Sequence, residues 1–190
     1  MDSTHRIVSS ETEELILVDE QDRETGFLSK ARCHDGAGIL HRAFSVFLFN
    51  DTGQLLLQQR SESKRLWPGY WSNSCCSHPR RGESMQVATA RRLYDELHVE
   101  ATLEFVYKFN YQAQFDASGA ENELCHVFLG MTGGEALPNA HEIAAIRYVS
   151  ADTLLAELSD PTKPYTPWFR MEWLTLIDAH RETLKRYCAV

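Results

Sequence analysis

The sequence lacks the long apolar run that a membrane-spanning helix requires. No stretch of the 190 residues approaches the roughly 18 consecutive apolar residues of such a span. Residues 1–14 are polar and acidic, so we expect no secretory signal. Internal repeats and low-complexity tracts are also missing, which argues against solenoid and fibrous architectures. We therefore expect a cytoplasmic protein that does not bind or cross a membrane.

The five cysteines lack the spacing of a disulfide framework or of a structural zinc site. Their number is odd, Cys75 and Cys76 are adjacent, and no two cysteines are separated by two residues. We expect reduced thiols, as in a cytosolic protein. The same spacing argues against a zinc-stabilised structural protein.

An excess of positive charge is also missing. The 19 Lys and Arg residues are outnumbered by 27 Asp and Glu residues, and the net charge of −8 argues against general binding of nucleic acid. Residues 60–92 depart from this pattern, with seven basic and two acidic residues and a local net charge of +5. Such a patch suits a small phosphate ester, although charge alone favours a solvated basic face.

The apolar residues predict a mixed layered domain. Short apolar runs bounded by turn residues are typical of strands, and Ser84 precedes a helical apolar period that it can cap. We expect strands at 14–19, 44–49, 54–59, 103–115, 124–131 and 146–149, and helices at 84–97, 151–158 and 168–187. We interpret most of residues 67–82 as an ordered loop because of its Pro and Gly content. The pattern predicts an α/β (α+β) fold in a single domain, 1–190.

Cys76 and His78 lie two residues apart in a loop that ends at Pro79. A thiol and an imidazole at this spacing could form a metal site or a reactive cysteine. Taken alone, the pair is weak evidence, because buried and inert cysteine is the commoner outcome.

Glu121 and Glu123 lie at the start of an expected strand and therefore point to the same face. Two adjacent carboxylates are costly unless a cation lies between them or one is protonated. The alternative is a solvent-facing acidic edge.

His34 and His41 flank a glycine-containing loop that could bring the two imidazoles together. With His78, Glu121 and Glu123, these residues form a donor set that suits Mn²⁺ or Zn²⁺, although spacing alone does not bring them together.

Arg92 and Glu96 are four residues apart on the expected helix 84–97 and share one face. One interpretation is a helix-surface ion pair. The other is that Glu96 holds a hard cation while Arg92 binds a phosphate oxygen.

Several motifs, in this order along the chain, are typical of one enzyme family. They are Phe27-Leu-Ser-Lys-Ala-Arg-Cys-His34, His41-Arg-Ala-Phe-Ser45, Leu57-Gln-Gln-Arg60, Ser63-Lys-Arg-Leu-Trp-Pro-Gly69, Trp71-Ser-Asn-Ser-Cys-Cys-Ser-His-Pro79, Gly82-Glu-Ser84, Glu121-Asn-Glu-Leu-Cys125 and Pro167-Trp168. On these motifs the chain resembles the type I isopentenyl-diphosphate isomerases, which interconvert isopentenyl and dimethylallyl diphosphate. The resemblance runs from about residue 15 to residue 173. It implies a Nudix-like fold with a mixed sheet layered between helices, a core at about 39–173, and an N-terminal extension that carries Lys30 and His34.

The resemblance also implies roles for the residues of the site. His34, His41, His78, Glu121 and Glu123 match the ligands of one divalent metal, Mn²⁺ or Zn²⁺. Glu96 and the backbone carbonyl of Cys76 match a Mg²⁺ site that forms with the diphosphate. The matched catalytic residues are Cys76, Glu123 and Tyr111, and the matched substrate-binding residues are Lys30, Arg60, Lys64, Arg92 and Trp168. The implied partner is a small allylic or homoallylic diphosphate bound to a monomer.

The chain departs from the Nudix hydrolase signature at several positions. Ser77 and His98 replace two glycines, Arg92 replaces a glutamate, and Asp95 shortens another. The isomerases share the arginine, whereas a glycine is common where Ser77 stands. A Nudix hydrolase of a nucleoside diphosphate derivative is therefore disfavoured. A non-enzymatic Nudix-like sensor of a phosphorylated ligand is the second alternative, but such a sensor has no need for an acid and a base.

The chemistry implied by the resemblance moves a double bond by adding one proton and removing another. An unactivated alkene is a weak base, so the proton donor has to be a positioned acid in a dry site. The face of Trp168 could stabilise a tertiary carbocation. We expect Glu123, with Tyr111, to give the proton and the Cys76 thiolate to remove one, with the reverse assignment left open.

Overall fold

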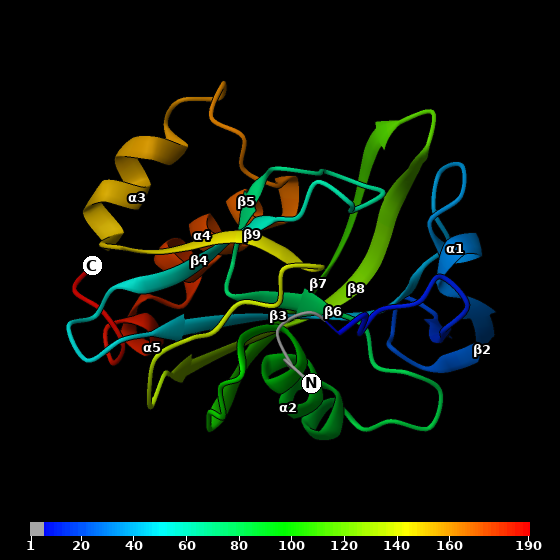
Figure 1. Cartoon of the computed structure of the whole chain (residues 1–190), viewed down its shortest axis with the longest axis horizontal. Coiled ribbons are helices and arrows are strands. Elements are labelled where there is room, and N and C mark those ends of the chain that lie inside the picture. Colours follow the sequence, from blue (N-terminus) through cyan, green and yellow to red (C-terminus); the bar gives the residue numbers. More distant parts are fainter. Residues whose placement is uncertain (1–5) are drawn as a thin grey trace.

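The computed structural model describes residues 6–190 and contains one mixed nine-stranded sheet with helices on both sides (Figure 1). The strands are β1 (Glu14–Val18), β2 (Glu24–Ser29), β3 (His41–Phe49), β4 (Leu55–Arg60), β5 (Trp71–Ser72), β6 (Cys75–Ser77), β7 (Leu103–Asp116), β8 (Gly119–Met131) and β9 (Ile143–Val149). The helices are α1 (Lys30–Cys33), α2 (Met85–Leu97), α3 (Ala151–Leu158), α4 (Pro167–Ala179) and α5 (Arg181–Leu184). This confirms the predicted fold class.

Strand β3 is the centre of the sheet and separates two apolar cores. Phe44, Val46 and Leu48 pack on the side of α2, whereas Phe47 and Phe49 pack on the side of α4. Alternate residues of a strand face opposite sides, so both faces of β3 have to be apolar. Helices α2 and α4 accordingly lie on opposite sides of the sheet in Figure 1.

The partners of β3 determine which residues meet at its start. Strand β8 runs parallel to β3 from the His41–Glu123 pair to the Phe49–Met131 pair, and β6 runs antiparallel to β3 with Cys76 opposite Ser45. Strand β7 then pairs with β8, with Tyr111 opposite Glu123. Directly paired residues point to the same face of a sheet. His41, Glu123, Tyr111 and Cys76 therefore face the side of α4 together.

Helix α2 confirms the prediction from its capping residue. The Ser84 Oγ accepts a hydrogen bond from the Val87 backbone N–H at 3.3 Å, and the helix ends where His98 adopts a left-handed conformation. Leu93 and Leu97 are buried against the sheet. The predicted helix 84–97 therefore begins and ends within one residue of the observed helix.

Several predicted element bounds were wrong, among them the starts of β3 and β9, which begin at His41 and Ile143 rather than at residues 44 and 146. Strand β2 was not predicted, and it forms because it pairs with β1, whose Leu15 and Ile16 are buried. Most of the segment 67–82 is loop, as predicted, but it also contains the short strands β5 and β6, which pair with β4 and β3. Strand β8 begins at Gly119 rather than Leu124. The C-terminal helix ends at Ala179, and α5 follows after His180, whose backbone is not helical.

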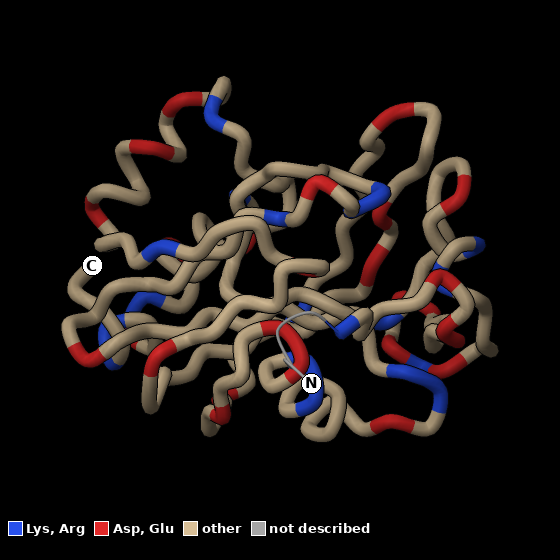
Figure 2. The backbone as a smooth tube through the Cα atoms, in the orientation of Figure 1, with Lys and Arg blue, Asp and Glu red and all other residues tan. Residues whose placement is uncertain are grey.

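The basic segment 60–92 does not form a solvated basic face. Arg80 pairs with Glu13 at 2.6 Å, Arg91 with Glu83 at 2.7 Å, and Arg65 with Asp35 at 2.6 Å. Basic and acidic residues are interspersed along the backbone in Figure 2.

No helix within residues 6–190 has the length and apolar character needed to cross a membrane. Residues 1–5 of the predicted domain 1–190 lie outside the described residues.

Candidate active site

Three imidazoles and two carboxylates converge at the start of β3. They belong to His34 after α1, His41 on β3, His78 after β6, and Glu121 and Glu123 on β8. One donor atom from each residue lies within 4.8 Å of those of the other four. The structure thus brings together residues from four separate segments, although spacing alone gave no reason for them to meet.

Backbone carbonyls fix the orientation of two of these imidazoles. The Nδ1 atoms of His34 and His41 lie 2.7 Å from the carbonyl oxygens of Lys30 and Ile39 respectively. Each ring therefore directs its Nε2 atom into the cluster, as the histidine ligands of metal sites do. The Nε2 atom of His41 is buried without a hydrogen-bond partner among the described residues. The donor set and this unpartnered nitrogen fit a divalent transition metal.

Burial and nearby charges shift the pKa values of the two carboxyl groups in opposite directions. Burial and the negative charge of Glu121 hold the pKa of Glu123 well above its usual range. Burial acts in the same direction on Glu121, but the adjacent His34 outweighs it and lowers the pKa of Glu121 to about 2. Without a metal, one carboxyl group is therefore ionised and the other protonated.

Glu123 has the most partners in the cluster. The hydroxyl of Tyr111 donates a hydrogen bond to Glu123 Oε2 at 2.6 Å, and His78 Nε2 lies 2.8 Å from Glu123 Oε1. Burial and the charge of Glu123 raise the pKa of Tyr111 well above its usual range, so the phenol keeps its proton and remains a donor. Glu123 thus belongs to the cluster and is also hydrogen-bonded to Tyr111 of β7.

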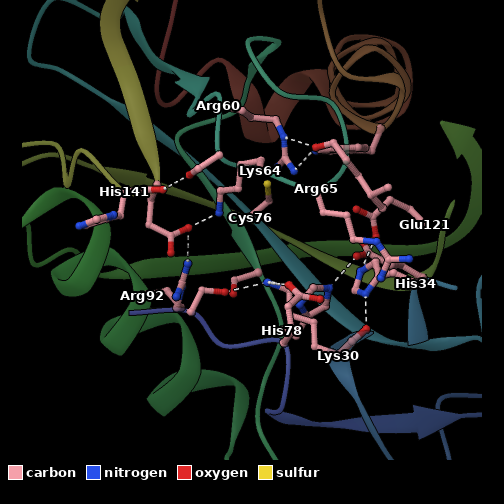
Figure 3. Close-up of a pocket in the computed structure, with 18 of the residues that line it drawn as sticks. Lys30, His34, Arg60, Lys64, Arg65, Cys76, His78, Arg92, Glu121 and His141 are labelled. Atoms are coloured by element: carbon pink, nitrogen blue, oxygen red, sulfur yellow. Dashed lines mark hydrogen bonds and ion pairs between the residues drawn. The ribbon is translucent and has the colours of Figure 1, made fainter. Parts of the chain in front are cut away.

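The adjacent thiols Cys75 and Cys76 point to opposite faces of β6. Cys75 is fully buried on the α2 side, and its Sγ lies 3.5 Å from Glu96 Oε1. Cys76 lines the cavity, near the centre of the labelled side chains in Figure 3. Burial raises the pKa of Cys76 to about 12, although the nearby positive charge of Arg60 favours the thiolate. Only Cys76 of this pair can contact a ligand in the cavity.

The cavity has a volume of about 340 Å³, and aromatic residues form part of its wall. Trp168 packs edge-on against Trp67 with ring centroids 5.2 Å apart, and its ring lies 6.2 Å from that of Tyr111. The guanidinium of Arg60 lies 5.3 Å from the Trp168 ring centroid and donates to the backbone oxygens of Leu66 and Trp67. This part of the cavity suits an apolar group.

Positive side chains line another part of the same cavity. Lys30, Lys64 and Arg92 all contribute to the wall. Lys30 donates a hydrogen bond to Ser9 Oγ at 2.7 Å, and burial lowers the pKa of its ammonium group. Three cations on one cavity wall suit a ligand with several negative oxygens.

The interpretation of Arg92 and Glu96 as a surface ion pair was wrong. Both residues are only 2% exposed, and Arg92 Nη2 lies 2.6 Å from Glu96 Oε1. The face that they share is covered because α2 packs its buried side against the sheet.

Several contributors to the cavity wall were missed from the sequence, among them Glu142 and Ser9. Glu142, just before β9, contacts Lys64 and Arg92, and Ser9 belongs to a segment that the sequence left without a role. Neither residue lies in a recognisable motif. A carboxylate directly before a strand was the only available signal for Glu142.

Comparisons with known proteins identify the family of the chain. The NUDIX domain model matches residues 39–169. An isopentenyl-diphosphate Delta-isomerase 1 of Photorhabdus laumondii is 39% identical over 90% of this chain and 99% of its own length. An isopentenyl-diphosphate Delta-isomerase of Nocardia farcinica is 42% identical over 90% of this chain and 98% of its own length.

Solved structures show the same fold at lower identity. A Deinococcus radiodurans protein superposes with a TM-score of 0.67 at 21% identity, covering 92% of this chain and 99% of its own. A MutT protein of Methanosarcina mazei superposes with a TM-score of 0.59 at 18% identity, covering 77% and 94%. These neighbours carry information about the fold alone.

Proposed function

The chain belongs to the isopentenyl-diphosphate Delta-isomerases of the Nudix family, and from this premise we propose how its pocket performs their reaction. It is an isomerase that interconverts isopentenyl diphosphate and dimethylallyl diphosphate. The observation that carries the residue roles is one cavity whose wall contains the Glu123 carboxyl group, the Cys76 thiol, the Trp168 indole and the cationic residues Lys30, Arg60, Lys64 and Arg92. The substrate contains matching parts, a short branched alkene and a diphosphate.

Glu123 gives the proton that starts the reaction from isopentenyl diphosphate. Its pKa is raised by burial and by Glu121, and Tyr111 holds one of its oxygens. A protonated carboxyl group in a dry pocket is a suitable donor to the terminal carbon of an alkene. The product of that step is a tertiary carbocation, which the adjacent Trp168 ring can stabilise by about 2 kcal/mol when desolvated.

Cys76 removes the second proton and thereby completes the shift of the double bond. From isopentenyl diphosphate, Glu123 has to start protonated and Cys76 as the thiolate, which the positive charge of Arg60 favours against the effect of burial. From dimethylallyl diphosphate the two protonation states are exchanged, because the same steps run in reverse. The neutral thiol favoured by burial is the form that starts from dimethylallyl diphosphate. The diphosphate is bound by Lys30, Lys64 and Arg92, with Arg60 closer to the hydrocarbon. This remote binding orients the alkene between the two proton-transfer groups.

The cluster of His34, His41, His78, Glu121 and Glu123 can hold a metal ion, and we propose Mn²⁺ or Zn²⁺. When bound there, the ion fixes the Glu123 carboxyl group and increases its acidity. A second ion, Mg²⁺, would be held by the diphosphate with Glu96 and the Cys76 carbonyl. Glu96 Oε1 already lies 2.6 Å from Arg92 Nη2, and Glu96 does not belong to the wall of the cavity.

We expect one tightly bound transition-metal ion per chain. Replacing His41 with alanine removes a buried donor, so metal content after dialysis, measured by elemental analysis, should fall well below one per chain. His180→Ala, outside the cluster, should leave it unchanged. Chelation of the bound ion should abolish turnover. A fully active chelated enzyme would contradict the proposed ligand set.

Further properties of the enzyme follow from the same arrangement. We propose that the Nudix core at about 39–173 and the N-terminal extension act as one domain, since Lys30 and His34 complete the cavity. We also propose that the enzyme is a cytoplasmic monomer.

Proton NMR in D₂O tests the reaction directly. We expect isopentenyl diphosphate, incubated with the enzyme, Mg²⁺ and Mn²⁺, to give dimethylallyl methyl signals with incorporated deuterium and no released phosphate. Deuterium enters because the donated proton exchanges with solvent. Phosphate release from nucleotides, without any isomerisation, would instead favour the hydrolase alternative. Arg92 makes that outcome unexpected, since it replaces a carboxylate of the hydrolase signature.

A further inference from the structure

Glu142 is a buried carboxylate at the cationic part of the cavity. It is 3% exposed and belongs to the cavity wall. Its Oε2 atom contacts Lys64 Nζ and lies 3.2 Å from Arg92 Nη2. One carboxylate oxygen therefore joins two of the three cations that we assign to diphosphate binding.

The backbone around Glu142 is fixed on two sides. The Glu142 N–H donates to the Asn139 carbonyl at 2.9 Å, and the Glu142 carbonyl accepts from the Ser61 N–H at 3.0 Å. Asn139 is fully buried, and its own N–H donates to the Glu96 carbonyl at 2.8 Å. The backbone that carries the carboxylate is thus hydrogen-bonded to Ser61, directly after β4, and through Asn139 to the end of α2.

Lys64 depends on Glu142 more than Arg92 does. Arg92 also pairs with Glu96 at 2.6 Å, whereas Glu142 is the only acidic partner of Lys64 among the described residues. A lysine has a flexible side chain whose ordering costs entropy, and a partner fixed by the fold supplies that ordering before the ligand arrives.

The two cations can bind Glu142 and a diphosphate at the same time. The ammonium group of Lys64 has three N–H donors, so its contact with Glu142 leaves donors free. The guanidinium group of Arg92 has five, of which Nε faces Glu96, Nη2 faces Glu96 and Glu142, and one Nη1 N–H donates to the Val8 carbonyl at 3.0 Å, so the second Nη1 N–H is left for the ligand. The carboxylate also offsets part of the repulsion among three clustered cations in the empty cavity. Glu142 therefore has the geometry of an orienting group rather than of a competitor for the ligand.

We propose that Glu142 is a positioning residue that holds Lys64 and Arg92 in place to receive the diphosphate. This inference rests on the proposed function for the identity of the ligand. It extends that function, because a negatively charged residue would then strengthen the binding of a negatively charged ligand.

The test is direct binding of inorganic pyrophosphate with Mg²⁺ to the metal-loaded enzyme by calorimetry, together with KM and kcat. Glu142→Gln keeps the shape of the side chain but removes its charge. We expect the Kd of pyrophosphate and the KM of isopentenyl diphosphate to rise about tenfold or more, as for the loss of one partner in a buried charge pair. We expect kcat to change much less, because the proton-transfer groups are untouched. Glu142→Asp should bind pyrophosphate more tightly than Glu142→Gln.

Glu157→Gln is the matched control, because it breaks an Arg147–Glu157 pair that lies outside the cavity wall. It should leave both constants unchanged. Unchanged or tighter pyrophosphate binding by Glu142→Gln would overturn the proposal, as would a fall in its bound transition metal. If Glu142→Gln does not fold, Glu142→Asp decides, because its shorter side chain should still weaken binding relative to the wild type. Wild-type enzyme that binds pyrophosphate without isomerising substrate would overturn only the proposed function.

Discussion

Replacing Cys76 with alanine should reduce kcat by about 1,000-fold or more, which is the scale of a lost proton-transfer group. The thiol lines the cavity on the face of β6 that Cys75 does not reach, so no neighbouring thiol can replace it. The variant should fold, because the substitution removes one sulfur atom from a partly exposed side chain. Steady-state turnover by NMR and a thermal melt measure the two effects separately.

Cys188→Ala is the control for this experiment. Cys188 is a buried thiol near the C-terminus, packed beside Gly53 and outside the cavity wall. Its loss should lower thermal stability slightly and leave turnover unchanged. Substantial turnover by Cys76→Ala would show that another group removes the second proton.

Replacing Glu123 with glutamine should reduce turnover by a similar factor. The amide has the same shape but cannot deliver a proton, and its nitrogen would face either the Tyr111 hydroxyl or the imidazoles. We therefore expect loss of the acid together with a weaker metal site. Turnover and bound metal per chain should be measured on the same preparation. Tyr111→Phe, which keeps the acid and loses only its hydrogen bond, should have a smaller effect.

Glu104→Gln is a matched substitution on β7, where Glu104 pairs with Arg186 away from the cavity wall. It should retain full activity. If Glu123→Gln also retained activity while keeping its metal, Glu123 would be a ligand only and the proton donor would have to be sought elsewhere.

The sequence was sufficient for elements with a local signal. Ser84 identified the start of α2, because a capping side chain followed by an apolar period is contained within a few residues. Strands β5 and β6 were missed, because two- and three-residue strands exist only through their partners. Strand β2 was missed for the same reason, since its sequence is mostly polar and its pairing with β1 is a tertiary contact.

The candidate site was predictable only in part. Periodicity placed Glu121 and Glu123 on one face, and the i, i+4 rule placed Arg92 beside Glu96. The convergence of three histidines on those carboxylates came from the family resemblance, because no local rule joins segments so far apart. Neither a local rule nor the family resemblance predicted a role for Glu142. Its role depends on a loop anchored through Asn139 to the end of α2, a contact that no sequence pattern encodes.

The parallel pairing of β3 with β8 has a consequence for the order in which the protein is made. His41 and Glu123 are neighbours in the sheet but lie about 80 residues apart in the chain. Such long-range pairing is slow to form because the intervening chain has to be closed first. While the protein emerges from the ribosome, the three histidines are present long before either carboxylate. A nascent chain that lacks β8 can therefore offer a metal only the three imidazoles, and the five-residue cluster can form only once Glu121 and Glu123 have been added.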